Sequence, residues 1–188
     1  MKLILASKSP RRKELLGMLS LDFRVEVQQA DETIAPGTPP QEAVEQLARR
    51  KARAVMAGPG EAVIGADTIV VLDGRIMGKP ADEADAKHML GALQGRSHSV
   101  FTGVCVRDSQ KEVARVCETQ VEFAPMTDEE IDWYVSTGEP MDKAGAYGIQ
   151  GLGGLFVREI RGDYYNVVGL PISCLYDMLK EEWGWHLK

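Results

Sequence analysis

The chain has 188 residues, 44% of them hydrophobic and 27% charged, and 22 Lys and Arg residues against 28 Asp and Glu residues give a formal net charge of −6. This composition is that of an ordinary soluble domain, and the acidic balance argues against binding of nucleic acid through bulk positive charge. No apolar run approaches the roughly 18 residues of a membrane span or the length of a signal-peptide core. Three widely spaced cysteines form no metal pattern, and their odd number fits a reducing compartment. We therefore expect a soluble, cytoplasmic α/β protein.

Strands and helices alternate along the first half of the chain. Apolar runs and helical spacing predict strands at residues 3–6, 23–27 and 62–72, and helices at 10–20, 40–57 and 82–93. Ser9 is a predicted N-cap with Pro10 at the first helical position, and Asp73-Gly74 predicts a hairpin turn after the third strand.

The second half breaks this alternation. Two long strands at 99–107 and 113–123 form a predicted hairpin, and a strand at 155–160 and a last helix from Pro171 to about 183 follow. Thr127 and Glu130 spell a capping box for one more helix, which a Gly-Glu-Pro sequence at 138–140 ends. A hairpin among alternating strands and helices favours a mixed sheet over a purely parallel one.

The start of the first predicted helix carries an unusual charge pattern. A helix N-terminus favours acidic residues, yet Arg11, Arg12 and Lys13 crowd this first turn just after Ser7 and Ser9. A strand, a serine-rich turn and a helix N-terminus with arginines together indicate a phosphate site. The alternative is a solvated basic turn that binds nothing.

Asp67 stands inside the apolar strand predicted at 62–72. A carboxylate is costly to bury there unless it is paired or bound to a metal, so we interpret Asp67 as functional. The alternative places Asp67 at a strand bulge or edge, where it only accepts backbone hydrogen bonds.

Other polar residues gain meaning only if the fold gathers them with Arg11 and Asp67. Glu32, Lys51 and Lys79 would each be ordinary surface charges taken singly. Gln150 lies in the glycine-rich segment 144–154, where its amide could read the edge of a base or simply be solvated. That segment lacks a dinucleotide-binding fingerprint, and its glycines suggest a backbone that closely approaches a ligand or another strand.

Five ordered blocks resemble the Maf family over essentially the whole chain. They read ASKSPRR at 6–12, GADT at 65–68, GKP at 78–80, AGAYGIQG at 144–151, and GDY to VGLP at 162–171. Maf proteins are nucleoside triphosphate pyrophosphatases related in fold to inosine triphosphate pyrophosphatases. The resemblance therefore implies a single domain over residues 1–188, with an elongated mixed β-sheet, flanking helices, and two lobes around a central cleft.

The resemblance also assigns roles by position. Asp67 matches the family's proton acceptor, and the substrate-specificity positions are Arg11, Thr68 and Gln150. The other polar cleft residues are Ser7, Arg12, Glu32, Lys51 and Lys79. The sequence at 148–151 looks like that of the subgroup acting on dTTP and UTP, whereas a sister subgroup acts on 7-methyl-GTP.

We expect hydrolysis of dTTP and UTP to the nucleoside monophosphate and pyrophosphate, a reaction that sanitises the nucleotide pool. Glu32 and Asp67 would bind Mg²⁺ or Mn²⁺, and Asp67 would orient or deprotonate the attacking water. The alternatives are a nucleotide-sensing regulator of division or septum formation, and a pyrophosphatase for a modified nucleotide such as 7-methyl-GTP. Turnover separates the sensor from the enzyme. The oligomeric state stays open, and the family resemblance allows a homodimer.

Overall fold

The computed structural model describes residues 1–186 as a mixed α/β fold. In this range six α-helices accompany a seven-stranded sheet with the order β2-β1-β3-β5-β6-β7, and β4 pairs with β3. None of the helices described in this range has the length and apolar character needed to cross a membrane. The chain divides into two compact units.

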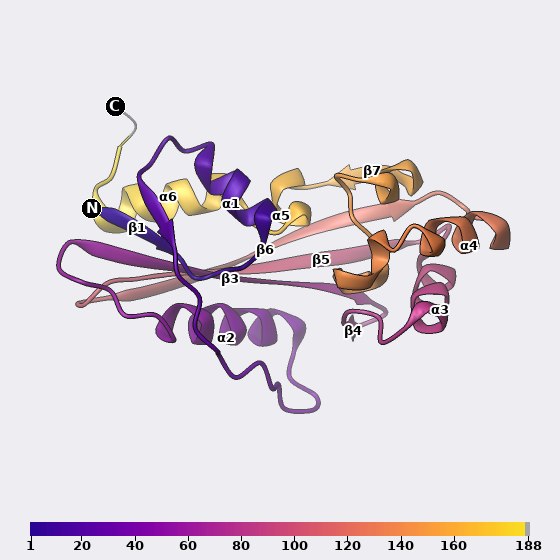
Figure 1. The fold of residues 1–188 in the computed structure, drawn as a ribbon, viewed down its shortest axis with the longest axis horizontal. Helices are drawn as coiled ribbons and strands as arrows, with labels where there is room; N and C mark the ends of the chain where they lie inside the picture. The colour runs from indigo at the N-terminus through magenta and orange to yellow at the C-terminus, as the bar shows by residue number, and fades with distance from the viewer. Residues whose placement is uncertain (187–188) are drawn as a thin grey trace. The chain divides into compact units, whose positions relative to one another are not determined.

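Unit 1 comprises Met1–Asp67, Thr102–Cys117 and the chain from Gly169 onward. Its elements are β1 (Lys2–Leu5), α1 (Pro10–Gly17), β2 (Phe23–Val25), α2 (Pro40–Arg53), α6 (Ile172–Trp183), and parts of β3 (Glu61–Leu72), β5 (Ser97–Arg107) and β6 (Glu112–Phe123). The strand β1 lies between β2 and β3 and runs parallel to both, with Ile4 opposite Arg24 and Val63. The helices α2 and α6 cover opposite faces of these strands (Figure 1).

Unit 2 comprises Thr68–Phe101 and Glu118–Val168. Its elements are β4 (Arg75–Met77), α3 (Glu83–Leu93), α4 (Asp128–Ser136), β7 (Val157–Arg161), α5 (Tyr164–Val168), and three short 3₁₀ helices, η1 (Glu139–Asp142), η2 (Ala144–Ala146) and η3 (Leu152–Phe156). Both β4 on β3 and β7 on β6 are antiparallel pairs, so the predicted mixed sheet is confirmed.

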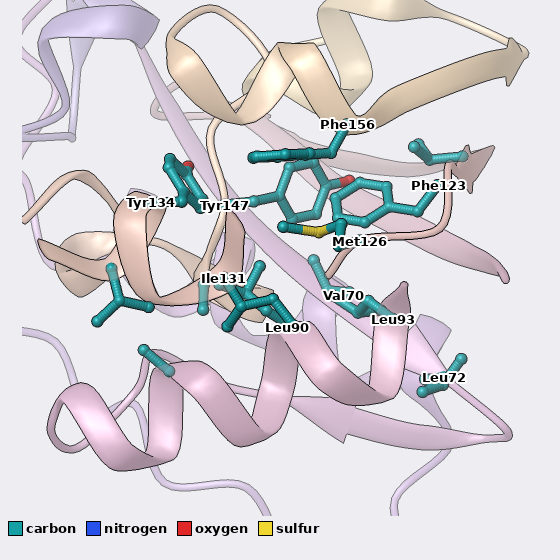
Figure 2. Close-up of a cluster of buried hydrophobic side chains, with 14 of the residues drawn as sticks. Val70, Leu72, Leu90, Leu93, Phe123, Met126, Ile131, Tyr134, Tyr147 and Phe156 are labelled. Carbon is teal, nitrogen blue, oxygen red and sulfur yellow. The ribbon is translucent and has the colours of Figure 1, made fainter. Parts of the chain in front are cut away.

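The core of unit 2 joins aromatic rings to aliphatic side chains. Figure 2 shows Tyr134, Tyr147, Phe123 and Phe156 gathered above Leu90 and its aliphatic neighbours. The Phe123 and Tyr147 rings meet edge to face at 4.7 Å between centroids, a favoured geometry for aromatic pairs. This core therefore anchors the glycine-rich segment at Tyr147.

Local sequence signals account for most of these elements. The Ser9 hydroxyl accepts a hydrogen bond from the Arg12 amide, which confirms the predicted N-cap of α1. The capping box of Thr127 and Glu130 is also present at α4. Asp73 and Gly74 both have positive φ, 50° and 75°, as a type I′ hairpin turn requires.

Element ends and one short helix differ from the predictions. The helix predicted at 10–20 ends at Gly17, and Ser20 has a positive φ of 52° that no helix can contain. The helix predicted at 40–57 ends at Arg53, and residues 155 and 156, predicted as strand, belong to η3. The helix α5 was not predicted; the buried Asn166 amide holds it by donating to Val100 and Thr119, both distant in sequence.

Candidate functional site

Six of the predicted site residues lie in unit 1 and three in unit 2. Ser7, Arg11, Arg12, Glu32, Lys51 and Asp67 belong to unit 1, whereas Thr68, Lys79 and Gln150 belong to unit 2.

The turn between β1 and α1 forms a small polar network. Ser7 is buried, and its hydroxyl accepts a hydrogen bond from the Ser9 amide at 3.2 Å and one from the Arg12 guanidinium at 3.4 Å. The first turn of α1 contains no acidic residue, and the partial positive charge of the helix N-terminus lies at this turn. An anion is therefore electrostatically favoured there.

Close packing of α2 on β3 brings Lys51 to Asp67. A Cβ atom at Gly65 would lie 2.6 Å from the Ala52 amide nitrogen and 2.9 Å from the Ala52 Cβ, so only glycine allows α2 this close. Alternate residues of a strand share a face, which puts Asp67 on the same face as Gly65, toward α2. Lys51 precedes Ala52 on α2, and its side chain reaches Asp67.

Lys51 joins two carboxylates. Its Nζ atom lies 2.5 Å from Oδ1 of Asp67 and 3.0 Å from Oε1 of Glu32. The Asp67 side chain is 14% exposed and that of Glu32 is 66% exposed. One acid is thus fixed inside the strand and the other faces solvent, with an ammonium held between them. This contact excludes the alternative in which Asp67 accepts only backbone hydrogen bonds.

Arg50, next to Lys51 on α2, holds the segment that carries Glu32. Its guanidinium donates to the carbonyl oxygen of Asp31 at 3.3 Å and to that of Thr33 at 2.5 Å. These carbonyls flank Glu32 on both sides. Neighbouring residues of one helix therefore place both the backbone and the carboxylate of this acid.

Arg12 contacts the chain beyond the turn that precedes α1. The Arg12 Nε donates to the Gly169 carbonyl at 2.7 Å, so Arg12 also ties α1 to the segment before α6. Burial lowers the pKa of Arg12 from its ordinary value, Asp67 and Glu32 oppose that shift, and the neighbouring Arg11 cation adds to it. Arg12 therefore lies within the electrostatic reach of both acids, and Arg11 lies beside it.

In unit 2 two of the motif blocks meet. The Gly145 amide donates to the Gly78 carbonyl at 3.0 Å, which joins the segment carrying exposed Lys79 to the glycine-rich segment. Gly145 has a φ of 70°, and a Cβ there would lie 2.9 Å from a Val70 methyl. At Gly145, the close approach predicted for the glycines of this segment is made to a side chain of β3. Thr68 is half-buried in β3, and Gln150 is exposed.

Sequence reasoning missed Tyr134 and Glu139. Their side chains hydrogen-bond to backbone amides at Gly148, Leu152 and Gly153, on either side of Gln150. Glu139 lies in the Gly-Glu-Pro sequence that predicted only the end of a helix. Tyr134 is one apolar position among several on α4, so neither carried a signal of this role.

The donor set fits a hard divalent cation that the substrate helps to coordinate. In residues 1–186 no group of three or more His, Cys, Asp or Glu side chains is placed to bind a metal. Glu32 and Asp67 nevertheless converge on one cationic point, the Lys51 ammonium. Mg²⁺ typically uses one or two carboxylates and takes its remaining oxygens from water and substrate phosphates, which suits this pair.

Known proteins resemble this chain along almost its whole length. Residues 2–182 match the family described as Maf-like protein. A dTTP/UTP pyrophosphatase of Symbiobacterium thermophilum is 55% identical and covers 96% of this chain and 93% of its own. Those of Thermococcus gammatolerans and Bacillus mycoides are 54% and 51% identical, covering 94% and 96% of this chain and 94% and 95% of their own.

Solved structures show the same fold at low sequence identity. A HAM1 protein from Coxiella burnetii matches with a TM-score of 0.52 and 17% identity over 96% of this chain and 99% of its own. The Staphylococcus aureus Ham1 protein matches with a TM-score of 0.50 and 16% identity over 66% and 72%. The predicted fold class is confirmed.

Proposed function

This chain belongs to the Maf family, and we propose that it is a nucleoside triphosphate pyrophosphatase that hydrolyses dTTP and UTP to the nucleoside monophosphate and pyrophosphate. The observation that carries the proposal is the cluster of Glu32, Lys51 and Asp67 in unit 1. Binding of phosphate alone gains nothing from two carboxylates, whereas hydrolysis uses them for a metal and a proton. The relatives named dTTP/UTP pyrophosphatase support the same substrates.

The cationic side chains bind and stabilise the phosphates. Arg11 and Arg12 stand at the positive N-terminus of α1, where backbone amides add further donors, and the Ser7 hydroxyl faces the same turn. We assign Lys79 and Lys51 to the same task. These groups stabilise the negative charge that develops on the leaving pyrophosphate.

Asp67 accepts the proton of the attacking water. Lys51 holds Oδ1 of Asp67 at 2.5 Å, which leaves Oδ2 as the atom assigned to the water. A carboxylate fixed in a strand and oriented by an ammonium keeps one geometry throughout the reaction. Lys51 thus acts on the chemistry by orienting the base.

Glu32 and Asp67 would hold a divalent cation, Mg²⁺ or Mn²⁺. When bound, such a cation lowers the pKa of a coordinated water and neutralises phosphate charge. Glu32 is the adaptable ligand because its side chain is 66% exposed, whereas Asp67 is fixed in β3. Arg50 limits that freedom by holding the carbonyls on both sides of Glu32.

Gln150 selects the base, together with Thr68. Uracil and thymine share an edge of acceptor, donor and acceptor, which a side-chain amide reads with one donor and one acceptor. Cytosine has an amino group at position 4 and an unprotonated N3, so both contacts are reversed and polar groups are left mismatched. The methyl group of thymine needs no reader for this discrimination, so dTTP and UTP are used about equally.

We propose that the chain is a single catalytic domain, because β3, β5 and β6 each contribute residues to both units. We propose a reducing, cytoplasmic location for this enzyme of the nucleotide pool, which the odd number of cysteines in the sequence fits. A homodimer remains a prediction of the family resemblance.

Replacing Asp67 by Asn tests the enzyme against a nucleotide sensor. Asn keeps the shape but accepts no proton, so release of pyrophosphate from UTP falls by about 10²–10⁴-fold. Binding of a non-hydrolysable UTP analogue, measured by calorimetry, stays within a few-fold. The matched control is Asp73→Asn, since Asp73 pairs with Arg96 at a hairpin turn and Asn tolerates its positive φ. Activity of the Asp67→Asn variant within tenfold of the wild type would remove Asp67 from the mechanism.

A further inference from the structure

The loop of residues 148–153, here called the Gln150 loop, is tied down on both sides of Gln150. The Gly148 amide, two residues before Gln150, donates to the Tyr134 hydroxyl at 3.1 Å. The Leu152 and Gly153 amides, just after it, donate to the two carboxylate oxygens of Glu139 at 2.9 and 3.0 Å. The backbone that carries the Gln150 side chain is thus fixed by side chains from other elements.

Tyr134 and Glu139 also bond to each other. The Tyr134 hydroxyl donates to Oε1 of Glu139 at 2.8 Å, so all of these contacts form one network. The Tyr134 ring comes from α4, is fully buried, and lies 5.5 Å from the Phe156 ring between centroids (Figure 2). Lys143 donates to the main-chain carbonyl of Glu139 at 2.6 Å. The loop is therefore anchored to the packed core of unit 2.

Two glycines of the loop, Gly151 and Gly153, lie directly against this network. A Cβ at Gly153 would lie 2.5 Å from the Tyr134 hydroxyl oxygen, and one at Gly151 would lie 2.6 Å from the Glu139 carboxyl carbon. A larger residue at Gly153 would collide with the buried Tyr134 hydroxyl, and one at Gly151 would displace the Glu139 carboxylate that holds the loop. Gly151 and Gly153 thus leave the room that the two anchoring side chains need.

Charge reinforces the network. Burial alone would raise the pKa of Glu139, but the Gly153 and Leu152 amides, the Tyr134 hydroxyl and the Lys143 ammonium together hold it below its usual range. Glu139 is therefore ionised at neutral pH and acts only as an acceptor, which gives the amides strong, charge-assisted bonds.

We propose that Tyr134 and Glu139 are positioning residues that set the preference of the site for UTP and dTTP over CTP, by holding the Gln150 loop in one conformation. This inference rests on the proposed role of Gln150 as the reader of the base. An amide discriminates between two bases that differ in the direction of two hydrogen bonds only when its orientation is fixed. Neither residue needs to touch the substrate.

Two conservative variants test the inference. Tyr134→Phe keeps the buried ring and removes the hydroxyl that joins Gly148 to Glu139. Glu139→Gln keeps the size of the side chain, but turns one acceptor into a donor that faces a backbone amide. For each variant kcat/KM is measured with UTP and with CTP, and hydrogen exchange is measured over residues 148–156.

The control variant is Thr127→Ala, which removes the N-cap of the same helix, α4, without touching the Gln150 loop. We expect the UTP-to-CTP ratio of kcat/KM to fall about tenfold in Tyr134→Phe and Glu139→Gln, the equivalent of about 1.4 kcal/mol, mainly through a higher KM for UTP. Exchange over residues 148–156 rises in both variants. The control keeps the wild-type ratio and exchange in this segment.

An unchanged ratio in both variants would overturn the inference, whether or not exchange in the loop rises. A ratio that falls equally in Thr127→Ala would also overturn it, because the effect would then follow general destabilisation of α4. Failure of the proposed function looks different: the wild-type protein would not hydrolyse UTP in preference to CTP. In that case unchanged hydrogen exchange would still refute the anchoring role of the two side chains.

Discussion

Replacing Gly65 by Ala tests how α2 presents Lys51 to Asp67. The added Cβ would lie 2.6 Å from the Ala52 amide nitrogen, and ordinary van der Waals contact begins at 3.4 Å. The Ala48 carbonyl oxygen would lie closer still, so the helix must retreat from β3 by about 1 Å. All of these contacting groups are backbone or Cβ atoms, which no rotamer change can move away. Lys51 moves with the helix, one residue before Ala52.

Two measurable effects follow from this displacement. Overpacking of this kind costs about 1–3 kcal/mol in the free energy of unfolding. Misplacement of a catalytic group by about 1 Å costs about 10²-fold in rate, so pyrophosphate release from UTP falls by that order. Urea unfolding measures the loss of stability. Steady-state kinetics, under conditions in which the variant stays folded, measure the fall in rate.

Gly91→Ala is the matched control. Gly91 lies in α3, and a Cβ there meets no atom within 4 Å, so the same substitution should stabilise the protein by about 0.5–1 kcal/mol and leave the rate unchanged. A Gly65→Ala variant as stable and as active as the wild type would refute the reasoning that close packing of α2 on β3 sets the Lys51–Asp67 contact.

Two further predictions concern Arg12 and His98. Arg12→Ala removes the bond to the Gly169 carbonyl and should lower the free energy of unfolding, measured with urea, by about 1–3 kcal/mol. Arg11→Ala removes a cation from a helix N-terminus and should leave the free energy of unfolding unchanged or slightly higher. Both substitutions should slow hydrolysis of UTP. Burial lowers the pKa of His98 from 6.5 to about 4, so the unfolded chain takes up the proton first and stability falls by about 3 kcal/mol between pH 6.5 and 4. In His98→Gln, compared with the wild type by urea unfolding across this pH range, the free energy of unfolding should lose this dependence on pH. An equal pH dependence in the two proteins would refute its attribution to His98.

Local signals were sufficient for most elements of the fold. The cap at Ser9, the capping box at Thr127 and the Asp73-Gly74 turn each depend on residues within four positions of one another, and all three were predicted. The short helix α5 was not, because its anchor is Asn166, which bonds to residues 66 and 47 positions away. Nothing near Asn166 in the sequence shows those partners.

The site followed a similar division. Asp67 could be predicted because a carboxylate in an apolar strand is unusual. The cations of α1 could be predicted because a helix N-terminus normally favours acidic residues. The contact of Lys51 with Asp67, by contrast, depends on Gly65, which in the sequence is one small residue in an apolar run. The role of Glu139 could not be predicted either, because its partners are backbone amides, which every residue except proline provides.

The central claim is tested most directly by the products that the wild-type protein forms from a panel of nucleoside triphosphates, with and without EDTA. We predict equal amounts of monophosphate and pyrophosphate from UTP and dTTP, at rates that exceed those with CTP by about 10²–10⁴-fold, and no turnover once EDTA has removed divalent cations. Release of orthophosphate instead of pyrophosphate, hydrolysis of CTP or 7-methyl-GTP as fast as UTP, or binding of UTP without turnover would contradict the account.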